Sequence, residues 1–187
     1  MAEQTIDRDV IAACQDGDRE AFRLLFELYK DKVFSIAVYS FSGDRTIADD
    51  VTQQIFLKLF TVIRQFRGHS EFTTWLYRLV INACVDERRR RKHLLPWGEA
   101  MPGIDQKKRP DNQYAKLEVA EAVRAAIAQL KPSFRTPVLL KYIDGLSYEE
   151  IAAVMGCSKG TVASRLNRAH AELARRLVHL KAEVSVE

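Results

Sequence analysis

The stretch that decides the fold is Leu146–Leu173, which reads LSYEEIAAVMGCSKGTVASRLNRAHAEL. Ser147 and Glu150 have the spacing of a capping box, in which each side chain accepts a hydrogen bond from a backbone N–H at a helix start. Gly156 can adopt the positive φ that ends a helix, and Ser158 can cap the helix that follows. The stretch therefore predicts a helix, a tight turn and a second helix, which is a helix-turn-helix.

The second of these helices has two different faces. Apolar residues recur at helical spacing and are expected to point inward: Val162, Leu166, Ala169 and Leu173. The opposite side is mixed polar and basic: Lys159, Ala163, Ser164, Asn167 and Arg168. Arg and Asn can pair with base edges in the major groove, and a small apolar side chain can contact a thymine methyl. The pattern favours DNA binding over an ordinary helical hairpin with a hydrated charged surface.

Composition narrows the class of protein. The chain has 187 residues, 47% of them hydrophobic, which is enough for one large or two small domains, and its formal net charge of +4 suits a nucleic-acid partner. No apolar run approaches the ~18 residues of a membrane span, and the first residues, MAEQTIDRDV, are too polar for a signal peptide. The three cysteines lie far apart, without metal-ligand spacing. We expect a cytoplasmic protein with reduced thiols, no membrane insertion, no metal and no cofactor.

Apolar periodicity predicts helices along the rest of the chain, with no strand signal, and so an all-α fold. After a loose start, we expect a helix from the turn at residues 16–18 to about Tyr39, a helix capped by Thr46, helices over Glu71–Lys92 and Gln113–Leu130, a helix capped by Ser133, and a last helix that ends near Leu180. Residues 93–112 are rich in Pro and Gly and show no periodicity. We therefore predict two small helical domains, residues 1–92 and 113–187, joined by a flexible linker at residues 93–112.

The helix capped by Thr46 has an outward face that is polar but almost uncharged. This face carries Asp50, Gln53, Gln54, Leu57 and Thr61. A purely solvated face more often carries Lys and Glu, so this one is a candidate protein-docking surface, with plain surface as the alternative.

The helix that opens near Glu71 carries an inner apolar stripe, an outer polar stripe that includes Arg78 and Asn82, and the basic run Arg88–Lys92. Phe72 and Trp75 fall on the inner stripe and are interpreted first as core residues. Five consecutive positions go right round a helix, so the run forms a basic collar. A collar at a helix end can simply complement the helix dipole, but beside a polar stripe we favour contact with phosphates, which would make DNA affinity steeply salt-dependent.

Four stretches in this order resemble one family closely: AFRLLFELYKDKVFSIA, DDVTQQIFLKLF, FRGHSEFTTWLYRLVINACVDERRRR and DGLSYEEIAAVMGCSKGTVASRLNRAHAEL. They resemble the bacterial RNA polymerase sigma factors of the extracytoplasmic-function group. The resemblance implies a non-enzymatic factor that binds the clamp and flap regions of core RNA polymerase and directs initiation at particular promoters. It also implies control by an anti-sigma factor and a response to envelope or environmental stress.

The resemblance assigns roles to matching positions. Docking on the polymerase clamp is implied for Asp50, Gln53, Gln54 and Leu57. Recognition and melting of the −10 element, with a base flipped into the loop Phe66–Ser70, is implied for Arg67, Gly68, His69, Ser70, Trp75, Tyr77, Arg78, Asn82, Arg88, Arg89, Arg90 and Arg91. Recognition of the −35 element is implied for Lys159, Thr161, Ala163, Ser164, Arg165, Asn167 and Arg168. The linker is expected to thread toward the polymerase active-site channel.

The sequence departs from the family pattern at three of the matching positions. Gln54 stands where the family usually has Glu, Ala163 where a basic residue is frequent, and His170 where Arg is common. One charge-assisted polymerase contact is therefore absent or replaced, and the −35 sequence is left open.

Two other classes of protein are compatible with parts of the sequence. A stand-alone helix-turn-helix regulator would dimerise and bind duplex DNA without polymerase, but the TWLYRL…RRRR stretch counts against it. An enzyme acting on nucleic acid would need a carboxylate dyad. The pairs Asp49/Asp50 and Glu149/Glu150 are adjacent in sequence, and adjacent helical positions diverge by about 100°, so neither pair forms a dyad unaided.

Overall fold

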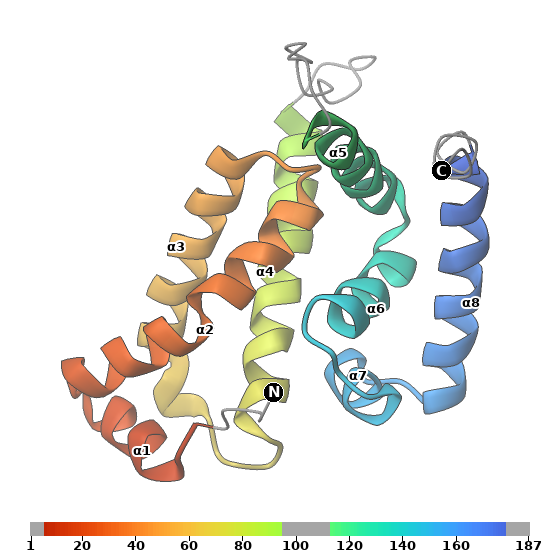
Figure 1. Cartoon of the computed structure of the whole chain (residues 1–187). Coiled ribbons are helices and arrows are strands. Elements are labelled where there is room, and N and C mark those ends of the chain that lie inside the picture. The colour runs from red at the N-terminus through yellow and green to blue at the C-terminus, as the bar shows by residue number, and fades with distance from the viewer. Residues whose placement is uncertain (1–5, 95–112, 179–187) are drawn as a thin grey trace.

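The computed structural model describes residues 6–94 and 113–178, and every regular element within them is a helix (Figure 1). The first group of elements is α1 (Arg8–Asp16), α2 (Arg19–Ser40), α3 (Arg45–Val62), the 3₁₀ turn η1 (Ile63–Gln65) and α4 (Phe72–Leu94). The second group is α5 (Gln113–Gln129), α6 (Pro132–Tyr142), α7 (Tyr148–Met155) and α8 (Lys159–Arg176). The predicted all-α class is confirmed.

The first group packs as a small bundle around α2. Figure 1 shows α2 lying diagonally between α3 and α4, with α1 at the lower end beside the start of α2. The side chains of Leu25, Val33, Ile36, Ile55 and Leu76 are fully buried where these helices meet. Burial of each such side chain contributes about 1.5–3 kcal/mol to folding, so the bundle is held mainly by this apolar core.

Helix α1 was not predicted, because the sequence before Asp16 was interpreted as a loose start. Asp7 caps it by accepting a hydrogen bond from the Asp9 N–H at 3.2 Å, and Gly17 ends it in the left-handed conformation with φ 94°. Only Ile11 and Cys14 of this helix are buried. With two buried residues in nine, the apolar pattern is too short to show a helical period.

Two predicted caps were wrong. Asp44, not Thr46, caps α3: its carboxylate accepts a hydrogen bond from the Ile47 N–H at 3.0 Å. Lys131 is the N-cap of α6, and Pro132 opens that helix where Ser133 was expected to cap it. Proline fits the first helical position because its missing N–H has no partner there.

The helix-turn-helix is confirmed in detail. The capping box is complete: the Glu150 N–H donates to the Ser147 hydroxyl at 3.2 Å, and the Ser147 N–H donates to the Glu150 carboxylate at 2.7 Å. Gly156 ends α7 with φ 61°, and the Ser158 hydroxyl accepts from the Thr161 N–H at 3.2 Å to cap α8. Local chemistry alone therefore sets both helices of the motif.

The two groups of helices contact each other directly, since α4 packs against α7 and α2 packs against α5 (Figure 1). Most of the predicted linker, residues 95–112 with Trp97 and Met101, lies outside the described residues, as does the predicted end of the last helix beyond Val178. His93 and Leu94 belong to α4 rather than to the linker.

Candidate nucleic-acid interface

The outward face of α8 is the first candidate surface. Val162, Leu166 and Ala169 are buried against α6 and α7, so the opposite side of α8 is fixed toward solvent. Of the residues predicted to read the −35 element, four are exposed: Lys159, Ser164, Asn167 and Arg168. The other three are partly buried: Thr161, Ala163 and Arg165. The helix thus presents a row of polar and basic groups of the kind that reads base edges.

The side chains at the start of α8 already have local partners. Lys159 forms an exposed ion pair with Glu149, and such pairs contribute little, about 0–1 kcal/mol. The Thr161 hydroxyl lies 2.9 Å from that of Ser158, and the Ser164 hydroxyl donates to the Thr161 carbonyl at 3.2 Å. Asn167 and Arg168, one turn further on, make the more available pair for base contacts.

The loop between η1 and α4 is the second candidate surface. Phe66 is half-buried. Its ring packs edge-on against Phe72, with ring centroids 5.4 Å apart, and at a tilt against Trp75, with ring centroids 5.5 Å apart. Phe72 is buried, as the core interpretation predicted, whereas Trp75 is only partly covered. Beyond Phe66 the loop turns into solvent: Arg67, Gly68 and His69 are exposed and Ser70 is partly buried. The base of the loop is therefore anchored, and its tip is free to contact a partner.

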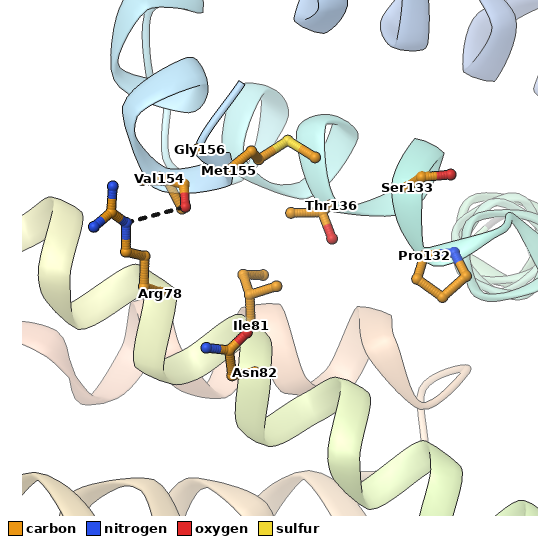
Figure 2. Close-up of a pocket in the computed structure, with 9 residues that line it drawn as sticks. All are labelled: Arg78, Ile81, Asn82, Pro132, Ser133, Thr136, Val154, Met155 and Gly156. Atoms are coloured by element: carbon orange, nitrogen blue, oxygen red, sulfur yellow. Dashed lines mark hydrogen bonds between the residues drawn. The ribbon is translucent and has the colours of Figure 1, made fainter. Parts of the chain in front are cut away.

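Two α4 side chains, those of Tyr77 and Arg78, contact the second group of helices. Tyr77 is only 2% exposed, and its hydroxyl donates to Oδ1 of Asp144 at 2.9 Å. The guanidinium of Arg78 donates to the Val154 carbonyl at 3.3 Å (Figure 2). It also donates to the Ala153 carbonyl at 2.5 Å, so both acceptors lie at the C-terminal end of α7. A cation is favoured there by the negative end of the helix dipole. In this arrangement, the Tyr77 hydroxyl and the Arg78 guanidinium, which were predicted to face DNA, are hydrogen-bonded to α7 and to the loop before it.

A cleft of about 430 Å³ lies beside this contact, between α4 on one side and α6 and α7 on the other (Figure 2). Arg78, Ile81 and Asn82 line it from α4, and Thr136 and Met155 line it from across the gap. Asn82 is exposed in the cleft. Of the three α4 residues Tyr77, Arg78 and Asn82, to which the family resemblance gave a −10 role, Asn82 is the one whose side chain is not engaged by the second group of helices.

The surroundings of Asp144 disfavour the ionised form of its carboxyl group. Burial raises the pKa of its carboxyl from 3.8 to about 6, against the opposing effect of the Tyr77 hydrogen bond. The second oxygen of the carboxylate, Oδ2, is buried without a hydrogen-bond partner. Burial, with the nearby Asp144 charge as a second cause, also raises the pKa of Tyr77. The contact between α4 and the α6–α7 loop thus contains a carboxylate that burial disfavours in its ionised form.

Several arginines of the basic collar at the end of α4 already have partners within the protein. Glu87, which is 6% exposed, accepts hydrogen bonds from Arg90 at 2.8 Å and from Arg91 at 2.6 Å. These two arginines hold the pKa of Glu87 below its ordinary value. Arg88 is turned inward and donates to the Ser40 carbonyl at 2.6 Å. Arg89 is exposed, and its Nη1 lies 3.9 Å from Oδ1 of Asp86.

Glu87 was missed by the sequence analysis, although its spacing from Arg90 and Arg91, three and four residues on, is that of helical ion pairs. Because this one glutamate binds two members of the run, fewer arginines are available to phosphates than the count of basic residues implies.

The outward face of α3 is the third candidate surface. Asp50, Gln53, Gln54 and Leu57 are all exposed, as predicted, and Leu57 is 70% exposed. Phe60, one turn beyond, is also exposed at its outer side while its ring packs edge-on against Phe22 at 5.1 Å. The face therefore places an exposed apolar centre beside amide and carboxylate groups, which is the composition of a protein-docking surface.

Two findings concern other kinds of site. In residues 6–94 and 113–178, no three His, Cys, Asp or Glu side chains come together as metal ligands would. Within the same ranges, none of the helices has the length and apolar character needed to cross a membrane.

The fold and these surfaces define a helical DNA-binding protein that joins a helix-turn-helix to a second helical unit. Residues 25–94 match the family described as Sigma-70 region 2, and residues 120–173 match the family described as Sigma-70, region 4. The ECF RNA polymerase sigma-E factor of Escherichia coli (strain K12) is 36% identical, over 90% of this chain and 93% of that protein. The RNA polymerase sigma-H factor of Pseudomonas aeruginosa is 34% identical, over 98% of this chain and 100% of its own.

Two solved structures share the fold. The chain superposes on CnrH, solved in complex with the cytosolic domain of CnrY, with a TM-score of 0.70 and 28% identity over 92% of this chain and 97% of that one. The sigma factor RpoE of Bartonella quintana, solved with the anti-sigma factor NepR, shares the fold with a TM-score of 0.63 at 23% identity, over 84% of this chain and 97% of that one. This chain belongs to the extracytoplasmic-function group of RNA polymerase sigma factors.

Proposed function

We propose that this sigma factor uses three separate surfaces to bring core RNA polymerase to its promoters. The outward face of α3 docks on the polymerase clamp, the loop at residues 66–70 together with α4 recognises and opens the −10 element, and α8 reads the −35 element. The two groups of helices correspond to two functional domains, predicted at residues 1–92 and 113–187, of which the first extends to Leu94 at the end of α4. The chain supplies binding energy and specificity, and the polymerase supplies the chemistry.

The observation that carries this proposal is that the chain holds two kinds of recognition surface on rigid helices. Asn167 and Arg168 are exposed on α8, and Leu57 is exposed on α3 one turn after Gln53 and Gln54. A stand-alone repressor has no need of the second surface. Linking two modest DNA contacts to a polymerase contact raises the affinity of the whole assembly through effective concentration.

The contact between α4 and α7 bears on how the chain engages DNA. Since Tyr77 and Arg78 bind the Asp144 loop and the end of α7, their predicted −10 contacts require α7 to move away from α4. We propose that polymerase binding selects this opened arrangement, in which the −10 and −35 surfaces are separated.

Regulation follows from the same surfaces. The Bartonella quintana relative was solved with an anti-sigma factor, and we propose that an anti-sigma factor of that kind binds this chain in the cytoplasm and covers its polymerase-docking face. Release in response to an envelope or environmental stress then permits transcription.

Run-off transcription tests the proposal. Core bacterial RNA polymerase is mixed with the protein and a pool of promoter fragments from its own genome, and the start sites of transcripts that depend on the protein are aligned. We expect shared −10 and −35 elements upstream of those sites. An N167A/R168A variant should lose −35 dependence, and R175A, at an exposed position nearer the end of α8, serves as the matched control. Absence of transcripts together with tight duplex binding by the free chain would instead establish a stand-alone regulator.

A further inference from the structure

Gln15, on α1, joins that helix to the start of the loop at residues 66–70. Its side-chain amide donates two hydrogen bonds, to the carbonyl of Ile63 at 3.1 Å and to the carbonyl of Phe66 at 2.7 Å. In return, Nε of Arg64 donates to the backbone carbonyl of Gln15 at 2.9 Å. An amide NH₂ has two N–H donors, and both are used on carbonyls that bracket η1. We call this set of three hydrogen bonds the α1 clasp.

The clasp acts at the residue where the loop begins. The Phe66 N–H already donates to the Ile63 carbonyl at 3.0 Å, and the Phe66 ring packs on Phe72 and Trp75. Gln15 therefore fixes the remaining group of Phe66, its carbonyl, which also belongs to the peptide bond leading to Arg67. With the ring, the N–H and the carbonyl all bound, the direction in which the loop leaves η1 is determined.

The loop itself has few restraints of its own. Arg67, Gly68 and His69 are exposed, and Gly68 lies at φ +71° with no atom within 4 Å of the position that a Cβ would take. A segment of this kind holds a defined shape only if its ends are held. The α1 clasp at one end and the start of α4 at the other are the restraints that the structure provides.

The helix that supplies the clasp lies outside the segment matched as Sigma-70 region 2, which begins at residue 25. It is nevertheless an ordered element, with a capped start, a left-handed Gly17 at its end and two buried side chains. Arg64 lies across this end, with a guanidinium nitrogen 3.5 Å from where a Cβ on Gly17 would be. Helix α1 is thus built against η1 and the loop rather than attached as an independent extension.

We propose that Gln15 is a positioning residue for promoter opening: through the α1 clasp it holds the loop at residues 66–70 in the shape that accepts a flipped base. The proposal rests on the −10 role given to this loop above. Flipping a base costs a few kcal/mol of unstacking, which binding of the base in the loop must offset. If the loop has to become ordered first, the ordering reduces the binding free energy that is left for this. Gln15 touches no DNA; it acts through Phe66.

The test compares Gln15→Met with Gln65→Met in reconstituted polymerase complexes. Met keeps the length and packing of Gln but donates no hydrogen bond. Gln65 lies on η1 itself, exposed, so it controls for loss of an amide near DNA. Opening is followed with 2-aminopurine placed at the flipped −10 position, and base preference is measured with the four bases at that position. Affinity for core polymerase and thermal unfolding are recorded for each protein.

With Gln15→Met we expect an approximately tenfold loss of open complexes on the preferred promoter and a collapse of the preference among the four bases, with core affinity unchanged. Gln65→Met should behave as the wild type. Arg64→Met, which removes only the bond to the Gln15 carbonyl, should give a smaller loss in the same two readouts, and it carries the test if Gln15→Met does not fold.

The outcomes separate the two proposals. If the wild type itself opens no promoter with core polymerase, the proposed function fails. If the wild type opens promoters and Gln15→Met retains the same base preference, or loses opening only in proportion to lost core affinity or stability, the positioning role is overturned and Gln15 is simply a structural residue of α1.

Discussion

Replacing Asp144 with Asn tests whether the contact between α4 and the loop that precedes α7 buries an unfavourable negative charge. The carboxylate accepts a hydrogen bond from Tyr77 on α4, while its other oxygen has no partner. Lys32, on α2, favours the ionised form, but burial outweighs both effects and raises the pKa to about 6. An Asn side chain has nearly the same shape, and its carbonyl oxygen can still accept the Tyr77 hydrogen bond, without the buried charge. Its NH₂ group takes the place of Oδ2, so the cost of burying that group is subtracted from the gain.

The size and sign of the effect follow from that pKa. A rise from 3.8 to about 6 corresponds to roughly 3 kcal/mol of folding free energy lost when the group is ionised. The folded state holds the Asp144 proton more tightly than the unfolded state does. The wild-type protein therefore has its full folding stability below pH 4 and loses roughly these 3 kcal/mol as the pH rises through 6. At pH 7.5 the D144N protein should therefore be more stable than the wild type by up to about 3 kcal/mol, and at pH 5 by roughly half as much.

Urea denaturation followed by tryptophan fluorescence, at pH 5.0 and pH 7.5 and constant salt, measures both differences. Asp49→Asn, at an exposed position on α3, is the control and should change stability by less than about 0.5 kcal/mol at either pH. The reasoning is refuted if D144N is no more stable than the wild type at pH 7.5, or if its advantage does not shrink at pH 5.

Four further substitutions test other features. Leu57→Ala should lower affinity for core polymerase and leave the urea midpoint unchanged, because the side chain is 70% exposed; unaltered affinity would remove the docking role of α3. Arg168→Ala should weaken discrimination at one −35 base pair by about 1–3 kcal/mol in competition binding, whereas equal weakening on all sequences would make it a phosphate contact. Ser147→Ala should lower the free energy of unfolding by about 1 kcal/mol through loss of the cap, and a neutral result would contradict the importance of the capping box. Gly156→Ala should cost about 1–2 kcal/mol from its φ of 61° alone, since nothing lies within 4 Å of the added Cβ; calorimetry that shows no loss would argue against this strain.

What the sequence predicted well was set by short-range chemistry. The caps at Ser147 and Ser158, the left-handed Gly156 and the buried side of α8 all depend on residues within a few positions of one another, so pattern alone identified them. The exposed face of α3 was predicted for the same reason, since helical periodicity determines which side chains point away from the core.

What the sequence did not predict depends on contacts between distant segments. Nothing near Tyr77 or Arg78 in the chain signals that their partners lie some seventy positions away, at Asp144 and at the end of α7. The clasp by Gln15 likewise joins segments about fifty positions apart. Glu87 is the exception: its arginine partners were visible at helical spacing, but its burial, which makes the pairing persistent, comes from the packing of α4.

The Arg78 contact has a consequence for how this protein tolerates sequence change. Its acceptors are main-chain carbonyls at residues 153 and 154, so the bond is indifferent to which side chains stand there. Ala153, whose side chain is exposed, can be replaced by other residues without weakening the contact between α4 and α7. What this contact requires is that α7 ends at the same position, which Gly156 determines. The side chains on the exposed surface of α7 matter less to it.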